Sequence, residues 1–215
     1  RALTAVDGVD LDVPRGRTLA LVGESGCGKS TIAKAIVGLA PVVGGRIMLD
    51  GATVTTERER HAARFRQRVQ MVFQDPYSSL NPRMTIAEAL DEALALHTEL
   101  TKSGRRSRIA ELLDMVAMTG TAADKYPAEF SGGQRQRIAI ARALATGPEV
   151  VIADEITSAL DVSVQAAILN LMREIQQRTG VAVLMITHNL AVGRYFSHRT
   201  AVMYLGRVVE NGDES

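Results

Sequence analysis

The sequence has little cysteine, little net charge and no long apolar run, and each of these absences excludes a class of protein. Its one cysteine, Cys27, cannot form an intrachain disulfide, which fits a reducing cytoplasm. Its formal net charge is only +1, which argues against general nucleic-acid binding because that function usually needs a basic excess on one face. It has no run of about 18 apolar residues, so we expect no membrane-spanning segment, and its first residues lack the basic-then-apolar build of a signal peptide.

What is present is enough for one α/β domain. The 215 residues allow a well-packed core with room for a small inserted subdomain, and no internal repeat or low-complexity segment interrupts them. Both ends of the sequence are abrupt, at Arg1 and at Ser215, so we expect it to be a fragment of a longer protein.

The stretch at 18–39 organises the rest of the chain. Its apolar run at 19–22 is typical of a strand buried on both faces, and a glycine-rich loop and an Ala/Ile-rich helical segment follow directly. The loop matches the Walker A pattern of a phosphate-binding loop. The matching residues are Gly23, Glu24, Ser25, Gly26, Cys27, Gly28, Lys29 and Ser30.

Each residue type in this loop has a physical reason. Glycines let the backbone take conformations that a side chain would obstruct, so that successive N–H groups curl around phosphate oxygens. The helix that begins with Lys29, Ser30 and Thr31 adds the positive end of its dipole to this nucleotide site. We expect Lys29 to reach the β- and γ-phosphates and the Ser30 hydroxyl to sit on Mg²⁺. A merely structural glycine turn is the alternative, but the flanking strand and helix favour nucleotide binding.

Strand and helix patterns alternate along the remainder. Strands are expected at 46–50, 69–73, 150–154 and 181–186, with antiparallel hairpins at 1–13 and 200–210. Helices are expected from Thr85, at 105–116, after Gly133 and from Asp161 to Gly180. The Arg/Glu-rich segment 56–68 is interpreted as a solvated face rather than a nucleic-acid patch, because acids are interleaved with its bases.

This alternation predicts an α/β fold with a mostly parallel sheet, helices on both faces and an N-terminal antiparallel β part. Residues 85–145 are interpreted as an all-helical subdomain, inserted between core segments at 1–84 and 146–215.

Two acids follow the strand at 150–154, at the edge of the sheet where the phosphate loop also lies. Asp154 is suited to bind Mg²⁺ through water, and Glu155 is suited to polarise the water that attacks the γ-phosphate. A helix N-cap explains many such pairs of acids. Their place after a phosphate loop favours the catalytic interpretation.

A second anion site is expected where another helix begins. The Ser131 hydroxyl and the amides of Gly132 and Gly133, followed by Gln134, lie at a helix N-terminus. One chain rarely needs two such sites for a single γ-phosphate. The economical explanation is that this second site serves the nucleotide of another subunit.

With these motifs the chain resembles the ATP-binding-cassette (ABC) ATPases, whose signature reads LSGGQ, over nearly its whole length. The resemblance implies two cassettes packed head to tail, with ATP and Mg²⁺ between the Walker A loop of one and the signature of the other. It also implies roles for Gln74, Asp161 and His188. These are a glutamine that senses Mg²⁺ and the attacking water, an aspartate that crosses the dimer seam, and a switch histidine that contacts the γ-phosphate.

The sequence departs from the family pattern in three places. Phe130 stands where the signature usually has leucine, and Ile156 replaces the proline that normally follows the catalytic glutamate. The first change lies at an apolar packing position and should be tolerated, whereas the second leaves the backbone less restrained and could slow hydrolysis. No aromatic residue precedes Phe65, so the residue that stacks on adenine in this family is outside the sequence or absent.

The segments 74–85 and 161–165 look like those of bacterial importers for oligopeptides, dipeptides and nickel. The resemblance implies a peripheral subunit on the cytoplasmic face of the cell membrane that drives peptide import. It would contact transmembrane permease subunits through the Gln74 segment and the helical subdomain, and serve an extracytoplasmic solute-binding protein indirectly. A non-transport cassette of the DNA-repair or translation type, or an importer for nickel or another small solute, is the alternative.

Overall fold

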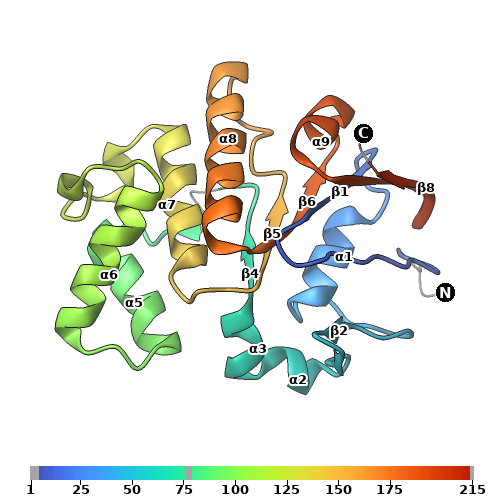
Figure 1. Ribbon diagram of the computed structural model, residues 1–215, viewed down its shortest axis with the longest axis horizontal. Helices are drawn as coiled ribbons and strands as arrows, with labels where there is room; N and C mark the ends of the chain where they lie inside the picture. The colour runs from blue at the N-terminus through green and yellow to red at the C-terminus, as the bar shows by residue number, and fades with distance from the viewer. Residues whose placement is uncertain (1–4, 76–78, 214–215) are drawn as a thin grey trace.

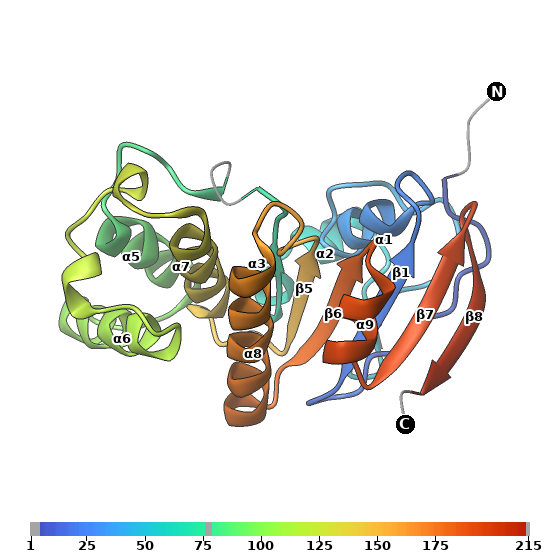
Figure 2. The same ribbon diagram turned by 90° about the horizontal axis from the view of Figure 1, so that it is seen from above.

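The computed structural model describes residues 5–75 and 79–213, and a six-stranded sheet lies at its centre (Figures 1 and 2). The strands follow the order β4-β5-β6-β1-β7-β8. Their bounds are β1 Thr18–Gly23, β4 Val69–Val72, β5 Val150–Asp154, β6 Ala182–Thr187, β7 Arg199–Tyr204 and β8 Arg207–Asp213. Neighbouring strands from β4 to β7 are parallel, and only β8 is antiparallel to its neighbour in this sheet. The mostly parallel α/β fold expected from the sequence is confirmed.

Helices cover both faces of the sheet, as Figure 1 shows. On one side lie α1 Lys29–Ile36, α2 Glu57–His61 and α3 Ala63–Arg68, and on the other lie α8 Val162–Thr179 and α9 Leu190–Phe196. Strand side chains alternate between the two layers: Ile152 and Leu184 belong to one buried cluster, and Val151 and Val183 to the other. Because both faces are covered, the strands are apolar without interruption.

A separate group of helices lies beyond β4, at one end of the sheet (Figure 2). Its members are α5 Ile86–His97, α6 Lys102–Met115 and α7 Gly132–Leu144. Thr85 and Glu88 form a reciprocal capping box at the start of α5, as their spacing predicts. Leu90, Leu112 and Ile138 are fully buried between the helices. We propose this group as the inserted subdomain expected at 85–145. None of the helices described in 5–75 and 79–213 is long and apolar enough to cross a bilayer.

The hairpin expected at 1–13 is wrong for the described residues 5–13, which contain no strand. This segment joins the hairpin of β7 and β8 through one backbone hydrogen bond, from the amide of Asp7 to the carbonyl of Gly206. Its apolar residues, Val6, Val9, Leu11 and Val13, pack against the core. The alternation of polar and apolar residues therefore reflects which side chains are partly buried against the core, and not a ladder of paired strands.

Other expectations need smaller corrections. The strand expected at 46–50 is a two-residue strand, β2 Met48–Leu49, paired with β3 Ala52–Thr53. The segment 56–68 is helical, but it is not only a solvated face, because Arg60 and Phe65 are buried. The helix α9 was not expected from the sequence, since it has only seven residues and contains Gly193.

An ion pair ties the start of β5 to the end of α3. Arg68 donates from Nε to Glu149 Oε1 over 2.6 Å and from Nη2 to Glu149 Oε2 over 2.8 Å, and Arg15 lies 3.0 Å from the same carboxylate. The hydrogen bond from Arg68 is the largest cause that lowers the pKa of Glu149, to about 2. The ionised form of Glu149 is thus favoured in the folded chain.

We expect Glu149→Gln to lower the free energy of unfolding at pH 7 by about 1–2 kcal/mol, since it removes one of the two carboxylates that Arg68 binds, the other being that of Asp50. Because the folded pKa of Glu149 is lowered from 4.5 to about 2, its stabilisation is present above pH 4.5 and is lost as the pH falls towards 2. Urea unfolding at several pH values checks this, with Glu174→Gln on the exposed side of α8 as the control. A pH-independent difference between Glu149→Gln and wild type would contradict the assignment.

Candidate functional site

The glycine-rich loop begins where β1 ends, and its backbone requires glycine. Gly26 has a φ of 84° and Gly28 a φ of 111°, both in the left-handed region that side chains rarely adopt. A Cβ on Gly23 would lie 2.2 Å from the carbonyl oxygen of Met203, on the neighbouring strand β7. The loop therefore turns tightly against the sheet before α1 begins, with Gly28 as the N-cap.

Lys29 is folded inward onto this loop. Its Nζ donates to the carbonyl oxygens of Gly23 over 2.7 Å and Glu24 over 2.8 Å, and the Cys27 sulfur lies 3.8 Å away. The Lys29 side chain is buried, as is that of Cys27. A positive charge is thus held inside the loop, next to backbone N–H groups that suit phosphate oxygens.

Ser30 and Asp154 meet at the edge of the sheet beside the loop. The Ser30 hydroxyl donates to Asp154 Oδ1 over 3.1 Å, which joins the first turn of α1 to the end of β5. Burial raises the pKa of Asp154, the hydrogen bond from Ser30 partly offsets this, and the charge of Glu155 raises it further. A buried carboxylate beside a hydroxyl fits Mg²⁺, because a divalent cation would compensate its charge.

Within residues 5–75 and 79–213, no cluster of three or more His, Cys, Asp or Glu side chains could hold a metal ion alone. Any Mg²⁺ at Ser30 and Asp154 would therefore take its other ligands from phosphate oxygens and water, as Mg²⁺ commonly does.

Glu155 and His188 lie at the same edge of the sheet as Asp154, because each directly follows the end of a strand, β5 or β6. The amide of Glu155 donates to the carbonyl of Ile186 over 2.9 Å, and the residue has a φ of 49°, which is uncommon for a non-glycine residue. His188 Nδ1 lies 3.4 Å from Glu155 Oε2, so the two side chains meet across the ends of β5 and β6. A carboxylate beside an imidazole is an arrangement that can serve general acid–base chemistry.

Gln74, which follows β4, is linked to Glu155 through the hydroxyl of Ser158. This contact of Ser158 was not expected from the sequence. Its Nε2 donates to Ser158 Oγ over 3.2 Å, and Ser158 Oγ donates to the carbonyl of Glu155 over 2.9 Å. The only signal for Ser158 was its position three residues after Glu155, where a serine hydroxyl commonly bonds a backbone carbonyl.

The second expected anion site does not lie at the chain's own phosphate loop. Ser131 caps α7 and forms a capping box with Gln134, and both views place α7 away from α1 (Figures 1 and 2). In the described part of the chain, no hydrogen bond or ion pair joins residues 131–134 to residues 23–31. In the described residues, the start of α7 is thus separate from the phosphate loop.

The structure also describes Asp161 and the two residues that depart from the family pattern, Phe130 and Ile156. Asp161 Oδ1 accepts from the amide of Val164 over 3.0 Å, and this bond is the main cause that lowers the pKa of Asp161. Phe130 and Ile156 are both buried in the core, which confirms an apolar packing position for Phe130. Pro76, Tyr77 and Ser78, within the importer-like segment, lie outside the described residues.

A central parallel strand, a glycine-rich loop and a helix that carries lysine and serine define a P-loop nucleotide-binding domain. Residues 6–158 match the family model described as ABC transporter. The chain belongs to the ABC transporter family, as the resemblance of its motifs indicates.

Two curated relatives carry more specific names. The "Probable peptide ABC transporter ATP-binding protein y4tS" of Sinorhizobium fredii is 50% identical over 206 residues, which cover 96% of this chain and 58% of that protein. The "Oligopeptide transport ATP-binding protein OppF" of Bacillus subtilis is 50% identical over 208 residues, which cover 96% of this chain and 68% of that protein. The chain thus spans 58% of the length of the first relative.

A solved structure agrees in fold over almost the whole chain. It is the dimeric structure of a post-hydrolysis state of the ATP-binding cassette MJ0796, bound to ADP and Pi. Its sequence is 30% identical, its TM-score is 0.83, and the match covers 98% of this chain and 91% of that chain.

We expect Asp154→Asn to raise the melting temperature of the nucleotide-free chain at pH 7, on the order of a few degrees. Because burial raises the pKa of Asp154, keeping its carboxylate ionised costs stability above that pKa, and the cost disappears as the pH falls through it. Asparagine carries no such charge and can still accept from Ser30.

Thermal unfolding between about pH 4 and 8 checks this expectation, with Asp124→Asn on the exposed surface as the control. The gain should be largest at neutral pH and shrink in acid. A less stable Asp154→Asn chain at pH 7 would oppose the account.

Proposed function

We propose that this chain is the ATP-binding and ATP-hydrolysing unit of an ABC importer for peptides. The observation that carries the proposal is the meeting of a phosphate loop, the Ser30–Asp154 pair and the Glu155–His188 pair at one edge of the sheet. The names of the two relatives support a peptide cargo over nickel, another small solute, or a DNA-repair or translation role.

ATP is the proposed nucleotide, because the chain belongs to the ABC transporter family and both relatives are named as ATP-binding proteins. ADP and Pi in the related cassette support this choice. The amides of the loop, with Glu24, Ser25 and Thr31 beside its glycines, would hold the phosphates together with Lys29. Ser30 and Asp154, with Gln74 nearby, would hold Mg²⁺, which when bound would neutralise part of the phosphate charge.

Hydrolysis would use groups of this chain at stated atoms. The Glu155 carboxylate is the general base that takes a proton from the attacking water. His188, whose Nδ1 lies 3.4 Å from Glu155 Oε2, would contact the γ-phosphate beside that base. Gln74 is linked to the backbone of Glu155 by two hydrogen bonds through the Ser158 hydroxyl. A displacement of Gln74 would therefore shift the position of the Glu155 carboxylate. Lys29 would stabilise the negative charge that develops on the phosphates.

The separated anion site at the start of α7 supports a dimer. Ser131, Gly132, Gly133 and Gln134 would complete the nucleotide site of a second cassette, and Asp161 would lie at the seam between the two cassettes. The dimeric assembly of the related cassette supports this arrangement. The second cassette is either a copy of this chain or a related chain.

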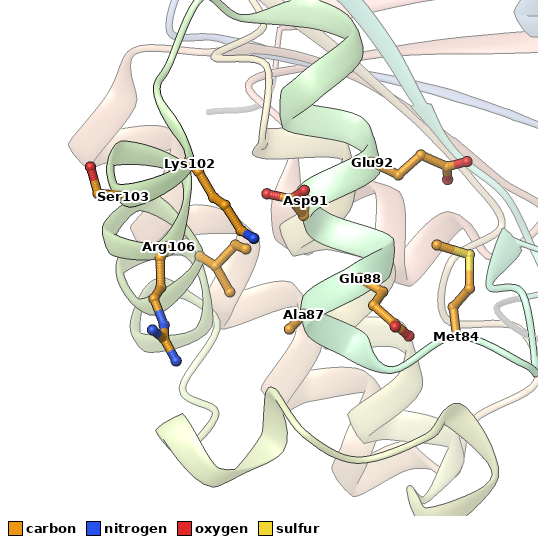
Figure 3. Close-up of a pocket in the computed structure, with 9 residues that line it drawn as sticks. Met84, Ala87, Glu88, Asp91, Glu92, Lys102, Ser103 and Arg106 are labelled. Atoms are coloured by element: carbon orange, nitrogen blue, oxygen red, sulfur yellow. The ribbon is translucent and has the colours of Figure 1, made fainter.

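The face formed by the helical group is proposed to receive the permease subunits. A pocket lies between α5 and α6, close to Met84 where the segment from Gln74 reaches α5. Figure 3 shows Lys102 extending from α6 towards Asp91 on α5, and Arg106 follows on the same helix. The pocket is thus lined by apolar side chains and by charges of both signs, a combination that protein–protein interfaces commonly show.

A location on the cytoplasmic face of the bacterial membrane follows from this proposal, since contact with the permease would hold the subunit there. An extracytoplasmic solute-binding protein would be linked to it only through the permease. Energy would pass from the nucleotide site to the permease through the segment after Gln74.

To test the proposal, the full-length protein is co-purified with its permease subunits, reconstituted in vesicles and assayed for ATP hydrolysis and peptide uptake. We expect Glu155→Gln to lower both rates by roughly 10² to 10⁴, because the general base is lost, while ATP binding is retained. Glu210→Gln on the exposed strand β8 serves as the control. Wild-type turnover in Glu155→Gln would rule out the assigned base, and ATP hydrolysis without peptide uptake would rule out the proposed cargo.

A further inference from the structure

The glycines at the start of α7 are in close contact with the start of α8. A Cβ built on Gly133 would lie 2.5 Å from Val164 Cγ1, and only 3.8 Å or more from the other Val164 carbons. A Cβ on Gly132 would lie 3.6 Å from Leu160 Cδ2, an ordinary contact. Gly133 is therefore the position at which a side chain is excluded, and one methyl group of Val164 excludes it.

The Val164 side chain has little freedom to move aside. A β-branched residue within a helix has one strongly preferred χ1 rotamer. Its backbone is also fixed, because the amide of Val164 donates to Asp161 Oδ1 over 3.0 Å and the Ser163 hydroxyl donates to the same oxygen over 2.8 Å. The obstructing methyl group is held by the N-cap of α8.

We propose that Val164 is a positioning residue for the anion site at residues 131–134, and that Gly133 is glycine because Val164 of its own chain lies against it. The inference deepens the proposed function and rests on it. The contact between Gly133 and Val164 packs the first turn of α7 against the first turn of α8. Since Asp161 caps that same turn, the two segments that would face the second cassette move as one unit.

The test is a set of substitutions that separates steric contact from direct contact with nucleotide. Gly133→Ala places a Cβ against Val164, so α7 must shift, and we expect ATP hydrolysis by the reconstituted transporter to fall by about 10²-fold with ATP binding retained. Gly133→Ala with Val164→Ala removes the methyl group at 2.5 Å and leaves Val164 Cβ at 3.8 Å, so most of the activity should return.

A matched control keeps the shape of the obstructing residue. Gly133→Ala with Val164→Ile retains a β-branched side chain with one strongly preferred χ1 rotamer, so it should not restore activity. The melting temperature of the nucleotide-free protein gives a second readout. The melting temperature should fall in Gly133→Ala, recover with Val164→Ala and stay low with Val164→Ile.

Recovery of both readouts only in the double alanine variant supports the proposal. Recovery of the melting temperature without recovery of hydrolysis would overturn it, since the added Cβ would then obstruct nucleotide and not α8. Full activity in Gly133→Ala would overturn it as well. If the wild-type protein does not hydrolyse ATP, the proposed function fails, and the melting temperatures alone still decide whether Val164 excludes a side chain at Gly133.

Discussion

The parallel register of β1, β5 and β6 is the constraint on which the site depends. Val22 pairs with Thr187, and Asp154 pairs with Ile186, so the three strands end at the same level. The glycine-rich loop, the two acids and the loop that carries His188 all leave the sheet at that level. The first turn of α1, which follows the glycine-rich loop, can therefore reach the Asp154 carboxylate through the Ser30 hydroxyl.

The parts of the fold that depend on local chemistry could be predicted from the sequence. Apolar runs gave β1, β5 and β6 within one residue, and capping residues such as Thr85 and Asp161 begin helices as expected. The alternating segment at 5–13 could not be read correctly, because alternation reports burial and not pairing. The sequence places Arg60 in a charged segment that is expected to face solvent, but its side chain is buried. Its burial comes from tertiary packing, which no local pattern encodes.

In the candidate site, too, some features could be predicted from the sequence and others depend on tertiary packing. Lys29, Ser30, Asp154, Glu155 and His188 could be placed near one another because each follows or opens an element of a parallel sheet. The link from the Gln74 side chain through the Ser158 hydroxyl to the backbone of Glu155 joins residues far apart in the chain, and it depends on side-chain orientation. The contact between the starts of α7 and α8 likewise appears only in three dimensions.

The central claim is that each nucleotide site is completed by the start of α7 from a second cassette. The most direct measurement is the specific ATP hydrolysis activity of the full-length protein, with its partner cassette if the two differ, over a dilution series in which light scattering follows assembly. The account predicts that specific activity falls in step with the fraction of dimer. Unchanged specific activity in samples that contain only monomers would contradict it.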